Sequence, residues 1–192
     1  MQSCRKNTRI VRQYRTITFR EKYKKITMTS YTNNGINFEQ FTGLRSLNIS
    51  SNYILCTTRL PPTLNVLYAH NDTNVNDRMV SMCTHLKKLI VYNNPNIITC
   101  APFAQHLVEL DASFNCGIDD VGLQTCYRLK KLDAGSNPKI TTCVPFAKTL
   151  KSLNAKDTCG ITDYGLRTCY RLKILRAINN PKISRRPIKT KN

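Results

Sequence analysis

The sequence predicts an α/β solenoid, in which short parallel strands stack into one curved sheet and short helices and turns lie on its convex side. Two observations predict this fold. A motif recurs seven times with its leading leucines 20 to 22 residues apart, and a fixed period of this length is typical of solenoids. Within each motif, apolar and polar residues alternate as in a strand with one buried face. The motifs begin at Leu44, Leu64, Leu86, Leu107, Leu129, Leu150 and Leu172.

Each motif predicts one short strand followed by a turn. In the third motif Leu86, Leu89 and Val91 are the apolar positions, and Asn94 is the ninth residue. An asparagine amide both donates and accepts hydrogen bonds. We therefore expect stacked asparagines at this position to satisfy backbone groups where the chain turns inside the core. A degenerate copy that begins at Tyr23 precedes the first clear motif.

Two types of motif alternate, so the unit of duplication is about 43 residues long. One type continues as Asn94-Pro-Asn, and proline ends the strand because it cannot donate to the ladder. Its return segment contains Cys100-Ala-Pro-Phe. The other type continues as Asn115-Cys-Gly, where we expect the glycine to provide the bend. Its return segment starts at Asp119, an acid that suits the beginning of a short helix.

Length and composition predict one soluble domain. The chain has 192 residues, of which 41% are hydrophobic, enough for a packed core. No apolar run approaches the roughly 18 residues of a membrane span, and residues 1–15 are too polar for a signal peptide. We therefore expect a cytoplasmic protein without membrane insertion. Residues 1–22 are predicted to form a basic N-terminal extension, residues 23–183 the repeat domain and residues 184–192 a basic tail.

Eight of the nine cysteines fall on the repeat. Equivalent cysteines such as Cys126 and Cys169 are two repeats apart, which corresponds to nearly 10 Å at about 4.8 Å per strand. A disulfide needs Cα atoms within about 7 Å. We therefore expect reduced, buried thiols that pack between repeats, with Cys4 as the exposed exception.

The motif pattern resembles the leucine-rich repeat family. The stretch from Ile161 to Leu172, Ile-Thr-Asp-x-Gly-Leu-x-x-Cys-x-x-Leu, resembles the cysteine-containing subtype of F-box-type substrate receptors. The paired Asn-Asn-Pro-Lys-Ile and Cys-Gly-Ile repeats are more similar to leucine-rich repeat proteins of large DNA viruses of amoebae. The resemblance covers residues 44–183 and implies an interaction surface, not a shared reaction.

Side chains that flank the buried strand positions are predicted to lie on the concave face, at positions five and seven of each motif. They combine aromatic and apolar residues with two aspartates on adjacent strands. Exposed aromatic residues are typical anchors of protein-binding surfaces, whereas such a mixed face is unsuited to following a phosphate backbone. The predicted protein-binding residues are Tyr68, His70, Ile90, Tyr92, Asp111, Asp133, Lys156 and Arg176.

The net charge of +19 is densest at the two ends of the chain. Such ends attract polyanions, including nucleic acid, or serve as solvated tails that keep the protein soluble. The predicted polyanion contacts are Arg5, Lys6, Arg9, Arg12, Arg15, Arg185 and Arg186. Basic residues also recur at position two, where they form either a non-specific phosphate contact or a solvated sheet edge. They are Arg45, Lys87, Lys130, Lys151 and Lys173.

Catalytic and metal-binding interpretations are not favoured. Cys83-Thr-His85 has the residue types of a nucleophile pair, but Cys83 occupies the structural cysteine position of the repeat. No Cys-x-x-Cys pair is present for zinc, and no glycine-rich loop for phosphate. The sequence therefore predicts no enzymatic activity, no metal and no cofactor.

The leading hypothesis is a non-enzymatic scaffold for protein–protein interactions. The viral resemblance implies a virion component or a host-interaction protein in the infected cell. One alternative is a basic nucleic-acid-binding or particle-packing protein that acts through its termini. An F-box-type adaptor is another, although no F-box precedes the repeats. The last repeat stops at Ile183 without a return segment, so we expect a partner or the tail to cover that end, because solenoids need capped ends.

Overall fold

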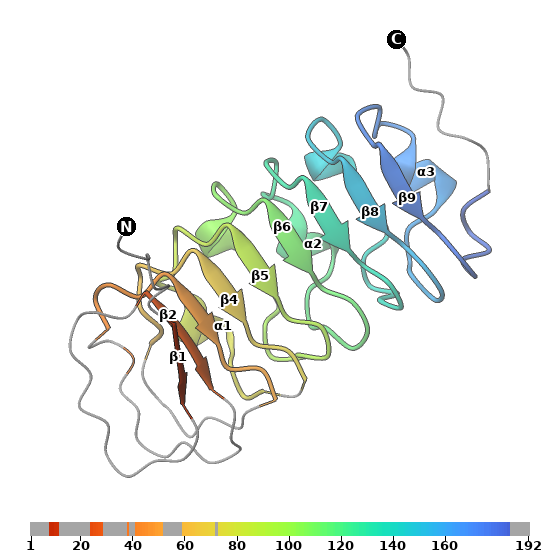
Figure 1. The fold of residues 1–192 in the computed structure, drawn as a ribbon. Helices are drawn as coiled ribbons and strands as arrows, with labels where there is room; N and C mark the ends of the chain where they lie inside the picture. Colours follow the sequence, from red (N-terminus) through yellow and green to blue (C-terminus); the bar gives the residue numbers. More distant parts are fainter. Residues whose placement is uncertain are drawn as a thin grey trace, which may run out of the picture.

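The computed structural model describes residues 24–28, 38, 41–51, 59–71 and 73–184 in full, and the backbone of residues 8–11. Within these residues, nine strands form one sheet in which all neighbours are parallel and follow sequence order (Figure 1). The strands are β1 (Thr8–Val11), β2 (Lys25–Met28), β3 (Ser46–Asn48), β4 (Val66–Tyr68), β5 (Lys88–Ile90), β6 (Glu109–Asp111), β7 (Lys131–Asp133), β8 (Ser152–Asn154) and β9 (Ile174–Arg176).

The seven predicted repeats form β3 to β9. The middle residue of each of these strands is the second leucine of a motif, and these leucines lie in register, as Leu89 does with Leu67 and Leu110. The predicted parallel solenoid sheet is therefore confirmed. The degenerate copy forms β2, in which Ile26 is buried. One further strand, β1, pairs with β2 and lies inside residues 1–22, the segment predicted as an extension.

Short helices and turns return the chain behind the sheet (Figure 1). Between residues 73 and 184, three α-helices, α1 (Asp77–Val80), α2 (Asp120–Leu123) and α3 (Asp163–Leu166), alternate with single 3₁₀ turns at Ala101–Phe103 and Val144–Phe146. The residue before each α-helix caps it, because its side chain accepts a hydrogen bond from a backbone N–H of the first turn. The caps are Asn76, Asp119 and Thr162. The helix start predicted at Asp119 is confirmed.

The first residue of each α-helix ties its repeat to the next one. The Asp77 carboxylate accepts the backbone N–H of Ile98 at 3.1 Å, and the Asp120 carboxylate accepts that of Thr141 at 2.8 Å. Asp163 accepts the backbone N–H of Ser184 at 3.1 Å. These aspartates therefore satisfy backbone donors of the following turn as well as favouring the positive end of the helix.

In the repeats from β5 to β9, the buried asparagine ladder occupies alternate repeats. Asn94, Asn137 and Asn180 are buried, whereas Asn115 and Thr158, at the same motif position, are exposed. The expected stacking of asparagines at this position is therefore confirmed for Asn94, Asn137 and Asn180 and is wrong for Asn115. In the other repeat type the buried residue is one position later, at Cys116 and Cys159.

Each buried asparagine reaches back to the preceding repeat. The Asn137 amide donates to the carbonyl oxygens of Ala112 at 2.8 Å and Ile118 at 3.2 Å, and its oxygen accepts the backbone N–H of Lys139 at 3.0 Å. Asn94 makes the matching contacts with the carbonyl oxygens of Ala69 and Val75. The amide therefore satisfies carbonyls of one repeat and a donor of its own turn.

A residue other than glycine adopts a left-handed backbone conformation in the bend after each of the strands β3 to β9. In every described repeat from β3 to β9 the second residue after the last apolar strand position has a positive φ. These residues are Ser51, Asn71, Asn93, Phe114, Ser136, Asp157 and Asn179. The glycines have another role, because a Cβ on Gly117 or Gly160 would lie 2.4 or 2.3 Å from a proline carbonyl oxygen of the preceding repeat. Gly117 lies at a bend, as predicted, but neither glycine has a positive φ, so close backbone approach and not conformational freedom explains these glycines.

Seven cysteines are buried and unbridged in the described part of the chain. Burial raises the pKa of the Cys83 thiol to about 12 and that of Cys116 to about 11. The Cys100 thiol hydrogen-bonds to Cys126, and this contact and then burial raise the pKa of Cys100. The expected burial is therefore confirmed for these seven, and their reduced state stays a prediction. Cys4 and Cys56 lie outside the described residues.

Candidate protein-binding site on the open face

The exposed side of the sheet, called the open face below, is built from β3 to β9 by the first and third residues of each strand. In β5 the middle residue Leu89 is buried, whereas Lys88 and Ile90 on either side of it are half-exposed. The predicted concave-face residues include the third strand position but omit the first. Strand alternation alone would have identified the omitted residues, which are Ser46, Val66, Lys88, Glu109, Lys131, Ser152 and Ile174.

Three aromatic side chains, called the aromatic row below, lie side by side where β4, β5 and β6 end. The rings of His70 and Tyr92 are stacked with centroids 4.1 Å apart, and the edge of Phe114 meets Tyr92 at 6.4 Å. The ammonium group of Lys156 lies 5.9 Å from the centre of the Phe114 ring. The structure therefore brings together three of the predicted residues and adds Phe114, which the sequence did not single out.

Phe114 departs from the pattern of its repeat position. It has a φ of 57° and is 44% exposed. The equivalent residues in the other described repeats are all Ser, Asn or Asp, which tolerate a left-handed backbone better than a bulky side chain does. Phe114 therefore combines an unfavourable backbone conformation with an exposed aromatic ring.

The two predicted aspartates are register partners beside this row, on β6 and β7. Asp111 accepts hydrogen bonds from the Ser113 hydroxyl at 2.6 Å and the Ser113 backbone N–H at 3.1 Å. Asp133 accepts hydrogen bonds from Asn154 at 2.9 Å and from a backbone N–H. Burial, with a smaller effect of the Asp133 charge, raises the pKa of Asp111 despite the Ser113 contacts.

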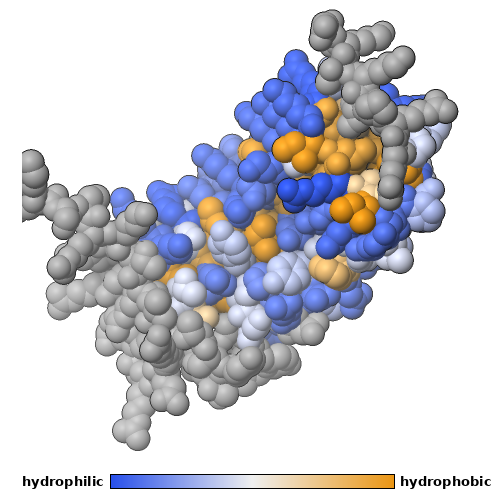
Figure 2. All heavy atoms as spheres, turned by 45° about the vertical axis from the view of Figure 1, so that its right-hand side comes forward, coloured by the Kyte–Doolittle hydropathy of each residue, from blue (hydrophilic) through white to orange (hydrophobic). Residues whose placement is uncertain are grey.

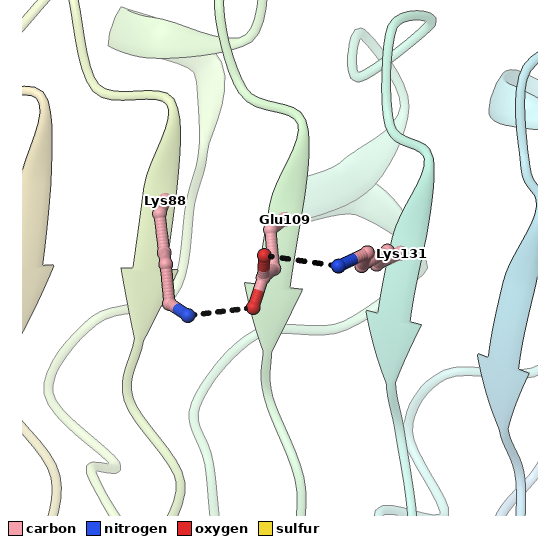
Figure 3. A network of polar contacts seen from close by, with 3 residues as sticks. All are labelled: Lys88, Glu109 and Lys131. Atoms are coloured by element: carbon pink, nitrogen blue, oxygen red, sulfur yellow. Dashed lines mark ion pairs between the residues drawn. The ribbon is translucent and has the colours of Figure 1, made fainter.

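An ion-pair network crosses the open face next to the aspartates. The Lys88 Nζ lies 2.7 Å from one Glu109 oxygen, and the Lys131 Nζ lies 3.7 Å from the other (Figure 3). The hydrogen bond to Glu109 raises the pKa of Lys88. The Lys88 Nζ also lies 5.7 Å from the centre of the Tyr68 ring. Lys88, Glu109 and Lys131 are first residues of their strands, which the predicted set of binding residues omitted. Lys88 connects this network to Tyr68.

A shallow depression of about 190 Å³ lies over β5 to β9 of the open face. It joins Ile90 and the aspartates to Arg176 at the far end. The exposed side chains that line it come from both strand positions of the open face. They include Ile90, Glu109, Asp111, Lys131, Asp133, Ser152, Asn154 and Arg176. Of the eight predicted residues, four therefore lie outside the depression. His70, Tyr92 and Lys156 lie in or beside the aromatic row, and Tyr68 lies beside Lys88.

The predicted terminal contacts with polyanions fall outside the described side chains. Arg9 lies in β1, of which only the backbone is described. The other predicted contacts, which are Arg5, Lys6, Arg12, Arg15, Arg185 and Arg186, lie outside the described residues altogether.

Apolar side chains gather at the C-terminal end of the described solenoid (Figure 2). Ile174 in β9 is 52% exposed and Ile178 is 64% exposed, although equivalent positions in the preceding repeats are mostly polar. This is the end that the sequence predicts to be covered. A partner at this end stays a prediction, because residues 185–192 lie outside the described part.

Among the described residues, no helix is long and apolar enough to cross a membrane. No group of three or more His, Cys, Asp or Glu side chains in the same part of the chain is arranged to hold a metal ion.

Comparisons with known proteins identify the fold through solved structures alone. No protein-family model matches the sequence, and no curated protein matches it. The internalin InlF from Listeria monocytogenes is similar with a TM-score of 0.60 and 23% identity, over 73% of this chain and 43% of that chain. InlJ from the same organism, whose functional domain includes a cysteine ladder, has a TM-score of 0.46 and 17% identity, over 88% of this chain and 47% of that one. This chain thus spans less than half of either protein, and its fold is the leucine-rich repeat solenoid.

Proposed function

We propose that this protein is a non-enzymatic scaffold that binds a protein partner on its open face, over β4 to β7. The aromatic row and the pair Asp111 and Asp133 form the centre of the site. One observation carries the proposal: three neighbouring groups of this site are held in states that lower the stability of the fold. They are Phe114, Asp111 and His70.

Each of the three has a separate physical cost. A left-handed backbone costs about 1–2 kcal/mol for an ordinary L-residue, and Phe114 adopts one. The pKa of Asp111 is raised above its ordinary value of 3.8. Protonated Asp111 therefore stabilises the fold below the pKa that this carboxyl has in the unfolded chain, and this stabilisation is lost as the pH rises through its pKa in the folded protein. At neutral pH the ionised carboxylate is unfavourable for folding. His70 Nδ1 is buried without a hydrogen-bond partner in the described structure, and burial lowers the pKa of this imidazole.

Locally destabilising residues are typical of binding surfaces, because natural selection for binding can retain residues that lower the stability of the fold. The chemistry of the site also defines the partner. Tyr92 and Phe114 offer ring surface to an apolar or aromatic side chain. The carboxylates of Asp111 and Asp133 suit a basic side chain, which would relieve their mutual repulsion. We therefore expect the partner to present an apolar anchor next to a lysine or arginine.

Replacing Phe114 with asparagine tests this proposal. We expect Phe114→Asn to raise the free energy of unfolding by about 0.5–1 kcal/mol, because asparagine tolerates the left-handed backbone better. We expect the same variant to lose the protein partner that the natural chain retains from a lysate of its source cells. Urea unfolding followed by circular dichroism measures the first effect, and affinity capture measures the second.

Ser136→Asn is the matched control, because Ser136 has the same backbone conformation one repeat later. It should change the free energy of unfolding by less than about 0.5 kcal/mol and leave the captured partner unchanged. A Phe114→Asn protein that is less stable than the natural one, or that keeps its partner, would refute the proposed role of Phe114.

The finer predictions rest on the sequence alone. We propose, from the resemblance to proteins of amoebal viruses, that the scaffold acts in the cytoplasm of an infected cell or in the virus particle. No observation on the described residues supports the F-box-type adaptor.

A further inference from the structure

A row of cations lies across the sheet at the N-terminal ends of its strands. Each row residue immediately precedes a strand, at the second position of its motif. The row, called the basic rim below, consists of Lys24, Arg45, Lys87, Lys130, Lys151 and Lys173, and all six are exposed. Two of these positions, at Asn65 and Val108, are uncharged.

A continuous ladder of backbone hydrogen bonds aligns the basic rim. Arg45 N donates to Lys24 O at 2.9 Å, and the bonds continue through every repeat to Lys173 N, which donates to Lys151 O at 2.8 Å. Eight consecutive positions with seven gaps of about 4.8 Å give a row about 34 Å long. The sequence predicts this line of cations, and the structure adds Lys24. Direct neighbours in the row are Lys24 with Arg45, and Lys151 with Lys130 and Lys173.

The charge of the basic rim is not balanced by nearby acids. In the described part of the chain the ion pairs join Lys88 and Lys131 to Glu109, and none involves a rim residue. Glu109 is already held by these two lysines. Lys130, Lys151 and Lys173 immediately precede three consecutive strands, β7, β8 and β9, so their charges repel at short range. A polyanion along the rim would relieve this repulsion.

Exposed aromatic residues occupy the turns that lead into the basic rim. Tyr127 and Tyr170, three residues before Lys130 and Lys173, are 52% and 58% exposed. Both follow a buried cysteine, which fixes their backbone in the turn before the strand. The exposed rings of His85 and His106 stack with centroids 5.2 Å apart in the neighbouring repeats. Aromatic side chains beside a line of cations are the elements with which proteins hold unpaired bases and their phosphates.

We propose that the basic rim binds single-stranded nucleic acid. The phosphates lie along the rim cations, and unpaired bases stack on Tyr127, Tyr170 and the histidine pair. A duplex is not the expected ligand, because its bases are already stacked and cannot reach the tyrosines. This site lies on the edge of the sheet and does not depend on the open-face site.

Fluorescence anisotropy of the full-length protein with a labelled single-stranded oligonucleotide of about 20 nucleotides tests the rim. We expect Lys130→Glu/Lys151→Glu to weaken binding at least about tenfold and to reduce the slope of log affinity against log salt by about 1.4, from two lost contacts. The matched control is Lys139→Glu/Lys182→Glu, which makes the same charge change at exposed lysines on the opposite edge of the sheet. Equal weakening by both pairs would overturn the proposal, because it would show a response to net charge alone.

A second double variant tests whether unpaired bases contribute to binding. Tyr127→Ala/Tyr170→Ala should weaken binding of the single strand at least about fivefold and leave binding of inorganic polyphosphate unchanged. Both tyrosines are exposed, so we expect the variant to fold, and its circular dichroism spectrum checks this. Equal affinities of the natural protein for single strand, duplex and polyphosphate, or tyrosine variants without effect, would show an unspecific anion surface and overturn the assignment to nucleic acid.

Discussion

A Gly122→Ala protein will unfold at a much lower urea concentration than the natural protein, with a loss of about 3 kcal/mol or more. A Cβ on this α2 residue would lie 2.2 Å from the carbonyl oxygen of Ile98 in the preceding repeat. That atom belongs to the backbone and cannot rotate away. The Gly122 carbonyl also accepts the Cys100 N–H at 3.0 Å, so separating the two segments weakens this bond as well.

Gly135→Ala is the control for this prediction. Its added Cβ would lie 3.0 Å from Cγ of Lys156, a side chain that can move, so we expect a loss below about 1 kcal/mol. Urea unfolding followed by circular dichroism measures both variants. Similar midpoints for the two would contradict the account of tight backbone packing between repeats.

The second large effect is expected at the buried asparagine ladder. Asn137→Ala removes an amide that satisfies the carbonyl oxygens of Ala112 and Ile118 and the N–H of Lys139. Buried backbone groups left without partners cost about 1–3 kcal/mol, and we expect a loss of about 3 kcal/mol because several groups are affected.

Asn115→Ala changes the same residue type at the same motif position but on the surface. We expect it to alter the free energy of unfolding by less than about 0.5 kcal/mol. Both variants are compared by urea unfolding at one pH. If the two lose equal stability, the alternation of the ladder between repeat types is incorrect.

The architecture was predictable because the same strand motif recurs in every repeat. The second leucines mark the middle of β3 to β9, and each lies in register with the next. The strand β1 was not predictable in this way, since Thr8–Val11 does not carry the leucine motif. The asparagine ladder was predictable in one repeat type only. In the other type Asn115 and Cys116 are adjacent small residues, and the motif alone does not decide which of them is buried. The following Gly117, which must approach a backbone carbonyl closely, was the available signal.

The candidate site was predictable where it lies on regular strand positions. Asp111 and Asp133 follow from the third strand position, and the structure shows them as register partners. Phe114 was missed because it lies in the bend, where its φ of 57° becomes visible only in the structure. The burial that raises the pKa of Asp111 depends on neighbouring repeats and cannot be read from a single motif.

Site-specific photo-crosslinking tests the central claim, that a protein binds the open face, most directly. A benzoylphenylalanine replaces Tyr68 on the open face in one protein and Tyr164, a 67% exposed tyrosine of α3 behind the sheet, in the other. We predict a specific crosslinked protein from position 68 that disappears when Asp111→Asn/Phe114→Asn is added, and none from position 164. Crosslinks from position 164 alone, or position-68 crosslinks that persist in the double variant, would contradict the proposed site.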